Sequence, residues 1–148
     1  MAGDILIQLS IGQRASCSKT FTETDVIMYA GISGDFNPIH IDKEYAKKSL
    51  FKERIAHGLL TSSLLSQLLG MHLPGKGSVY MNQTIRFTLP VFIGDTITAT
   101  GVIEEIDDKR KTVTLFTECH NQHNKIVLTG KAMMLVPGGV TSERENRN

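Results

Sequence analysis

The spacing of hydrophobic residues changes its period twice along this chain of 148 residues. From residue 4 to residue 9, isoleucine and leucine alternate with other residues, and a second extended stretch runs from Gly12 to Phe21. A period of two is typical of strands with one buried face. Both stretches therefore predict edge strands at the start of the chain.

A helical signal follows directly. Thr22 and Asp25 fit a capping box, in which each residue satisfies a free backbone N–H of the other at the start of a helix. The apolar residues that follow have helical spacing until Gly31 and Gly34 interrupt it. We expect a short helix here that leads into the next loop.

A second short helix is expected to begin at Asp42, whose side chain can cap it, and to run through Lys48. Tyr45 and Ala46 would be its inward residues, while its lysines face water. From Gly58 to Gly70 leucines cover most of the helix circumference, so that helix should be buried. Gly70 is a reasonable stop before a loop over 74–77.

After this loop the period returns to two. Long strands are predicted over 79–89, 96–106, 112–120 and 125–136, and turn-forming residues join them. A sheet wrapped around the apolar helix would bury the apolar face of every strand. The sequence thus predicts an α+β architecture in a single domain over 1–137, followed by a polar, loose tail over 138–148.

Composition narrows the class of protein. The net charge of +1 comes without a basic block, which argues against nucleic acid and against an anionic membrane surface as partners. No apolar run is long enough to span a bilayer, and the amino terminus does not resemble a signal peptide. Only two cysteines are present, Cys17 and Cys119, in no close-spaced motif. These features favour a soluble protein in the reducing cytoplasm.

The candidate chemistry lies in the segment Gly34-Asp35-Phe36-Asn37-Pro38-Ile39-His40. Pro38 fixes its own φ and favours extended backbone at Asn37, so few conformations of the loop are available. Asp35 and His40 can then converge on one water or substrate atom, as general acid–base catalysis requires. Turn formation alone would also explain this composition.

A second segment, Ala56-His57-Gly58-Leu59-Leu60-Thr61, opens the apolar helix. The first N–H groups of a helix have no partner within it, and they carry a partial positive charge. The N–H of Gly58 can therefore stabilise a developing negative oxygen. His57 is interpreted as a helix-entry residue and receives no role in the chemistry.

Two other groups suggest sites only superficially. Cys119, His120 and His123 are expected at a hairpin tip, where side chains alternate between faces and no further ligands complete a metal site. Lys76 lies between two glycines in a segment too short for a phosphate-binding loop, although it could meet a phosphate of coenzyme A. We expect no metal site.

Together these segments resemble a known family, the MaoC-like hydratases and dehydratases of the hot-dog fold. The similarity extends over nearly the whole chain except the tail, and it is strongest to the single-domain (R)-specific enoyl-CoA hydratases. The residues that carry it are Gly34–His40, Ala56–Leu60, Leu73–Tyr80 and Phe87–Asp95.

The resemblance implies reversible hydration of trans-2-enoyl-CoA to (R)-3-hydroxyacyl-CoA, with neither metal nor redox cofactor. By match, Asp35 and His40 are the catalytic pair, and the N–H of Gly58 holds the thioester oxygen. Asn37 matches the loop asparagine, and Ser66 matches a helix serine near the active site, although it could also be an ordinary helix serine. Leu69 is our candidate for the acyl tunnel. The resemblance also implies a homodimer or a larger homo-oligomer.

Three other functions stay open on the sequence. A dehydratase acting on acyl-carrier-protein thioesters would use the same residues but would need a protein-docking surface. A hot-dog thioesterase would release free thiol. A non-catalytic acyl-CoA-binding module would bind the ligand without hydrating it.

Overall fold

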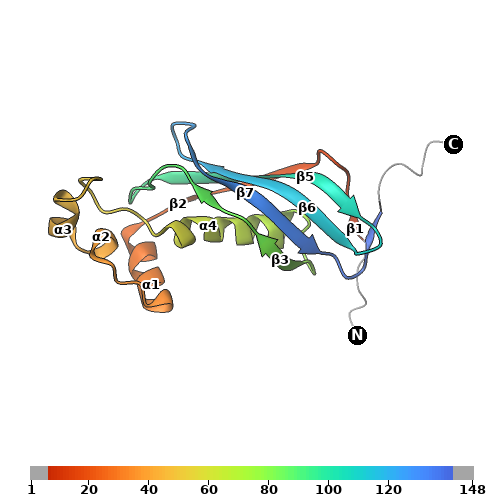
Figure 1. Cartoon of the computed structure of the whole chain (residues 1–148), viewed down its shortest axis with the longest axis horizontal. Coiled ribbons are helices and arrows are strands. Elements are labelled where there is room, and N and C mark those ends of the chain that lie inside the picture. The colour runs from red at the N-terminus through yellow and green to blue at the C-terminus, as the bar shows by residue number, and fades with distance from the viewer. Residues whose placement is uncertain (1–6, 142–148) are drawn as a thin grey trace.

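The computed structural model describes residues 7–141, whose main sheet is antiparallel and packs along a central helix (Figure 1). The strand order is β2-β5-β6-β7-β3, and β4 also pairs with β7. The strands are β2 (Arg14–Thr20), β3 (Val79–Gln83), β4 (Arg86–Phe87), β5 (Thr96–Asp107), β6 (Thr112–His120) and β7 (Ile126–Leu135). The central helix is α4 (Gly58–Gln67). This arrangement confirms the expected hot-dog fold of the α+β class.

Burial alternates along β5 and β6, as the period of two predicts, and places one face of the sheet against α4. Leu64, Leu65 and Leu68 are buried in one cluster with Ile97 and Leu128 of the sheet. Each fully buried leucine stabilises the fold by roughly 2 kcal/mol relative to an exposed one. The contact between helix and sheet is therefore the main core.

The central helix differs from the prediction in two ways. It is not buried on all sides, because Leu59 is 60% exposed. It also does not stop at Gly70, because the chain continues as a π-helical turn, η1 (Leu68–His72). The N–H of Leu73 donates to the carbonyl of Leu68 at 3.0 Å, so an extra residue enters the last turn.

Three short helices form an arm beyond the end of α4, on the left in Figure 1. We call this arm, residues 22–48, the helical arm; it contains α1 (Glu23–Ser33), α2 (Pro38–Ile41) and α3 (Lys43–Lys47). The capping box of Thr22 and Asp25 is present. However, α1 continues through Gly31 and ends only at Gly34, whose φ of 78° lies in the left-handed region.

The third helix of the arm begins as expected, since the Asp42 side chain accepts a hydrogen bond from the N–H of Tyr45. Ala46 is fully buried, but the prediction that Tyr45 also points inward was wrong, because Tyr45 is 52% exposed. Adjacent positions of an α-helix do not lie on the same face, so burial of Ala46 leaves Tyr45 outside the core.

The strand predicted over 79–89 is broken into β3 and β4, and both pair with β7. The break lies at Thr84, whose N–H donates to the carbonyl of Lys131 at 2.9 Å. A Cβ at Gly130 would lie only 1.7 Å from the carbonyl oxygen of Thr84. Because Gly130 has no side chain, the backbone at Thr84 can approach β7 closely. A continuous strand over 79–89 would not need this close approach.

The two ends of the described chain lie together. β1 (Ile7–Gln8) pairs in parallel with β8 (Val140–Thr141). The part of the expected tail that the structure describes is thus a short strand rather than a loose segment, because its backbone groups find partners near the amino terminus. The strand predicted from residue 4, and the tail from residue 142, extend outside the described residues. Among residues 7–141, no helix combines the length and the hydrophobicity needed to cross a bilayer.

Candidate active site

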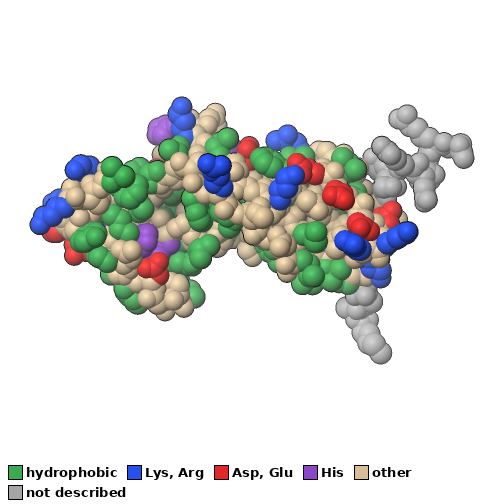
Figure 2. Space-filling model, viewed as in Figure 1, with side chains coloured by type: hydrophobic (Ala, Val, Ile, Leu, Met, Phe, Trp, Pro, Cys, Tyr) green, Lys and Arg blue, Asp and Glu red, His purple; other side chains and the backbone are tan. Residues whose placement is uncertain are grey.

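A cavity of about 480 Å³ lies between the helical arm and the sheet. Its walls are mostly apolar, and Asp35, His40, His57 and Gly58 are among the residues that contribute polar groups. Histidine and acidic side chains meet at this hollow in Figure 2. We call it the catalytic cavity. It has the size and the composition of a small-molecule site, with few polar groups in apolar surroundings.

The loop after α1 orients the carboxylate of Asp35. Its Oδ1 accepts a hydrogen bond from the N–H of Asn37 at 3.0 Å. The Oδ1 of Asn37 in turn accepts from the N–H of Ile39 at 3.2 Å, and Pro38 occupies the first turn of α2. One carboxylate oxygen of Asp35 is therefore engaged within the loop, and Oδ2 is directed toward His40.

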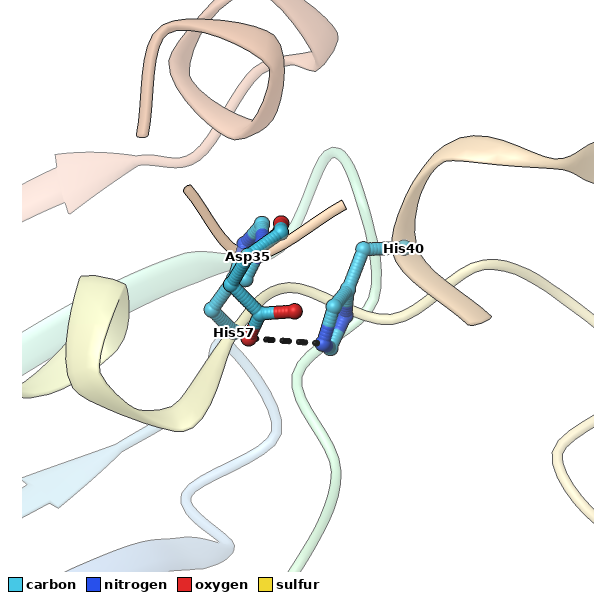
Figure 3. Close-up of side chains that lie close together, drawn as sticks. All are labelled: Asp35, His40 and His57. Atoms are coloured by element: carbon cyan, nitrogen blue, oxygen red, sulfur yellow. Dashed lines mark hydrogen bonds and ion pairs between the residues drawn. The ribbon is translucent and has the colours of Figure 1, made fainter. Parts of the chain in front are cut away.

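His40 is held from the opposite side. Its Nδ1 lies 2.7 Å from the carbonyl oxygen of Ile55, which can only accept, so we assign the proton to Nδ1. The lone pair of Nε2 then faces Asp35 Oδ2 at 3.9 Å, as the dashed line in Figure 3 marks. This distance is too long for a direct hydrogen bond, but it suits two acceptors that share one water.

The surroundings favour neutral His40. Burial lowers the pKa of His40, and the nearby His57 lowers it further, while the hydrogen bond to Ile55 and the charge of Asp35 oppose the shift. The side chain of His40 is 10% exposed and that of Asp35 is 49% exposed. A neutral imidazole with a free Nε2 lone pair can act as a base.

His57 belongs to this cluster, which the sequence analysis missed. Its Nε2 lies 2.9 Å from the backbone carbonyl oxygen of Asp35, and its ring stacks on that of His40 with centroids 3.8 Å apart. Figure 3 shows its ring beside the Asp35 and His40 side chains. Its position directly before the apolar helix was the only available signal, because the contact joins residues 22 positions apart.

The amino terminus of α4 opens into the catalytic cavity at Gly58. His57 is the N-cap, but no side chain caps this end by a hydrogen bond. A Cβ at Gly58 would lie 2.9 Å from two ring carbons of Phe87. The missing side chain thus lets an aromatic wall and a ligand oxygen come close to the exposed N–H groups.

Two buried polar atoms near this helix start have no hydrogen-bond partner among the described residues. They are Nδ1 of His57 and Oγ1 of Thr61. Both residues line the catalytic cavity. Buried polar atoms in proteins almost always have partners, so these two are positioned to bind water or a polar atom of the ligand.

The other predicted site residues lie elsewhere. Asn37 is exposed and caps α2, and it does not line the catalytic cavity. Ser66 is exposed on α4, and Leu69 is fully buried in a second core cluster, so neither lines it. A rise of about 1.5 Å per residue places Ser66 roughly 12 Å along the helix from Gly58. The structure of a single chain thus brings together Asp35, His40 and Gly58, but not these three.

Within residues 7–141, one group of His, Cys, Asp and Glu side chains offers three ligand atoms close together. It comprises Asp35, His40 and His57, with these atoms within 4.8 Å of one another. Cys119 does not lie at a hairpin tip, as predicted, but is fully buried within β6. Burial raises the pKa of its thiol to about 12, so it is a core residue.

Comparison with known proteins identifies the family of this chain. The MaoC like domain family matches residues 8–124. The chain is 44% identical to an (R)-specific enoyl-CoA hydratase of Rhodospirillum rubrum, over 85% of this chain and 87% of that protein. It is 41% identical to an (R)-specific enoyl-CoA hydratase of Aeromonas caviae, over 87% of this chain and 96% of that protein.

A solved structure has a similar fold. The (R)-hydratase from A. caviae involved in PHA biosynthesis superposes with a TM-score of 0.85 at 41% identity, covering 87% of this chain and 98% of that one. The family match, the identity to relatives and the similarity of the backbone therefore agree over most of the chain. The chain belongs to the MaoC-like domain family.

Proposed function

We propose that this protein is a hydro-lyase that reversibly adds water to trans-2-enoyl-CoA to give (R)-3-hydroxyacyl-CoA. The observation that carries the proposal is the pair of free acceptors, Asp35 Oδ2 and His40 Nε2, that face each other at 3.9 Å in the catalytic cavity. The names of its relatives support the substrate and the configuration of the product.

The water molecule would lie between the two acceptors. Each of its hydrogens can point to one of them, which directs an oxygen lone pair toward C3 of the enoyl thioester. As the oxygen bonds to C3, the pair removes one proton from the water and returns one proton to C2. The reaction needs no other reactant, and the same steps in reverse eliminate water. Acid–base catalysis of this kind contributes about 10²–10⁴-fold.

The thioester oxygen needs its own partner, because negative charge collects there when C3 is attacked. Gly58 at the start of α4 offers its N–H together with the partial charge of the helix end. One well-placed donor of this type is worth roughly 3–4 kcal/mol. We assign this role to Gly58.

Two further residues position the pair. The hydrogen bond from His57 to the Asp35 carbonyl fixes the loop relative to α4, and the N–H of Asn37 fixes one oxygen of the Asp35 carboxylate. We assign a positioning role to both residues. The proposed contacts of Asn37, Ser66 and Leu69 with substrate stay predictions.

The proposed reaction uses neither metal nor redox cofactor, because proton transfer and one amide donor complete it. Coenzyme A is the carrier of the substrate. A cytoplasmic location also stays a prediction.

We also propose that two copies of the chain associate through β3. This strand lies at one edge of the sheet, and its Val79, Tyr80 and Met81 are exposed. An apolar edge strand with free backbone groups is an association surface, and pairing of two such strands would cover it. Light scattering should give twice the mass of one chain, and a monomer at all concentrations would contradict the proposal.

An assay of crotonyl-CoA tests the function. Loss of the ultraviolet absorbance of the conjugated thioester should accompany formation of the (R)-3-hydroxy product, identified by chiral analysis. Hydration only of acyl-carrier-protein thioesters would favour the dehydratase alternative. Release of free thiol would favour a thioesterase, and binding of crotonyl-CoA without turnover would favour a non-catalytic module.

A further inference from the structure

A second hollow, of about 280 Å³, lies behind one wall of the catalytic cavity. We call it the basic hollow. It is lined by Lys43, Lys47, Lys52, Glu53, Arg54, Phe92 and Ile93. Residues 43–54 carry five basic and two acidic side chains, whereas the whole chain has a net charge of +1. Positive charge is thus concentrated at this end of the molecule, where Figure 2 shows Lys and Arg side chains at the left.

The two hollows share a wall. Phe51 and Ile55 line the catalytic cavity, and the three residues between them line the basic hollow. Ile55 pairs with Phe92 in an isolated antiparallel bridge, and the N–H of Ala56 donates to the carbonyl of Val91 at 2.7 Å. A ligand whose reactive end lies at Gly58 therefore has the basic hollow just across this short wall.

Some basic side chains of the hollow form ion pairs with carboxylates, and others do not. Lys47 pairs with Glu44 at 2.8 Å, and Arg54 pairs with Glu23 at 2.7 Å. Lys43 and Lys52 have no carboxylate within 4.0 Å among the described residues. Glu53 is the one carboxylate that lines the hollow. Four basic groups against one acid favour an anion, and two of the four ammonium or guanidinium groups are free to bind it.

Phe92 and Ile93 add an apolar surface to the charged rim. An aromatic ring beside basic side chains is the combination that stacks a nucleobase while it binds phosphate. A hollow of this size suits a nucleotide rather than a whole acyl carrier. Coenzyme A ends in such a group, an adenosine that carries a 3′-phosphate and a diphosphate.

We infer that the basic hollow binds the phosphorylated adenosine end of coenzyme A, with Lys43 and Lys52 as its phosphate ligands and Phe92 beside the base. This inference rests on the proposed function for the identity of the carrier. The hollow gives the enzyme affinity for the carrier at a place remote from the reacting carbons.

The test compares crotonyl-CoA with crotonyl-pantetheine, which lacks the nucleotide. In Lys43→Gln/Lys52→Gln, kcat/KM for crotonyl-CoA should fall at least about tenfold through KM, since two charge-assisted contacts are lost. The value for crotonyl-pantetheine should not change. Glu53→Gln should act in the opposite direction and lower KM for crotonyl-CoA. Lys109→Gln/Lys125→Gln is the matched control, because both lysines are exposed on hairpin turns.

Calorimetry with adenosine 3′,5′-bisphosphate supplies a readout that needs no turnover. Wild type and the control should bind it, and Lys43→Gln/Lys52→Gln should bind it more weakly. Equal losses for both thioesters, or unchanged binding of the bisphosphate, would overturn the inference. Losses confined to acyl-carrier-protein substrates would also overturn it in favour of protein docking. If wild type hydrates neither thioester but binds the bisphosphate, the proposed reaction fails and the nucleotide site stands.

Discussion

The catalytic cavity and the basic hollow differ in the number and the exposure of their charged groups. They lie on either side of a wall formed by residues 51–55 and 91–93. In the catalytic cavity, titratable groups are few, and His40 is largely buried. In the basic hollow they are many and mostly exposed. Interactions between charges are strong where water is excluded and weak where it is not. The cavity is therefore suited to proton transfer, and the hollow to recognition of a carrier.

The largest effect should come from the acid–base pair. Asp35→Asn keeps the acceptor for the N–H of Asn37 but removes the charge, and His40→Gln removes the base. Each should lower kcat about 10³-fold for both crotonyl-CoA and crotonyl-pantetheine. Asp108→Asn, on the exposed turn between β5 and β6, is the control. If folded variants keep near wild-type kcat, the two roles are wrong, and so is the contrast between the hollows.

Gly58→Ala should have the next largest effect, with kcat lowered by about 10–10³-fold because the added methyl group obstructs the amide donor. The methyl group would also displace Phe87. Gly58→Ala/Phe87→Leu separates these causes, since Leu leaves room for the methyl group. Recovery of kcat in the double variant would show that the ring, and not the donor, caused the loss.

The pH dependence tests the buried state of His40. Its pKa is lowered mainly by burial, so the acid limb of kcat/KM should lie below pH 6.5, the ordinary value for histidine. The same shift affects stability. Between the lowered pKa of the folded state and 6.5, the unfolded state binds more protons, so the free energy of unfolding should fall as the pH falls through this window.

An NMR titration of the His40 ring, with His40→Gln to assign its signal, measures this pKa directly. A value at or above 6.5 would mean that solvent reaches the ring more freely than its 10% exposure indicates.

The smallest expected effect is that of chelation. Because the proposed chemistry needs only proton transfer and an amide donor, dialysis against EDTA should leave kcat unchanged. The cluster of Asp35, His40 and His57 makes this a useful test, since its ligand atoms lie within 4.8 Å of one another. Loss of activity on chelation, with recovery on adding zinc, would identify a metal centre and replace the acid–base scheme.

Local signals in the sequence predicted the features that depend on neighbours in the chain. The capping box at Thr22, the cap at Asp42 and the three long hairpin strands all follow from spacing and turn chemistry. The placement of Asp35, His40 and Gly58 around one cavity required the resemblance to a family. Without that resemblance, the composition of the loop from Gly34 to His40 favours a purely structural turn.

Features that depend on distant contacts were not predicted. The π-helical turn replaced the stop at Gly70, and the break in the strand depends on the contact between Thr84 and Gly130. His57 was missed because its partners are a backbone carbonyl and a ring brought near by folding. The pairing of β1 with β8 joins opposite ends of the chain, which no local pattern can encode.

The close approach of Thr84 to Gly130 has a consequence for the catalytic cavity. Because the chain shifts there before it enters β4, Phe87 is anchored to β7 of the sheet, whereas Asp35 and His40 belong to the helical arm. The cavity is thus assembled from two separately supported parts. A side chain at position 130 would disturb the alignment between them from outside the cavity, and so would impair turnover without touching any reacting group.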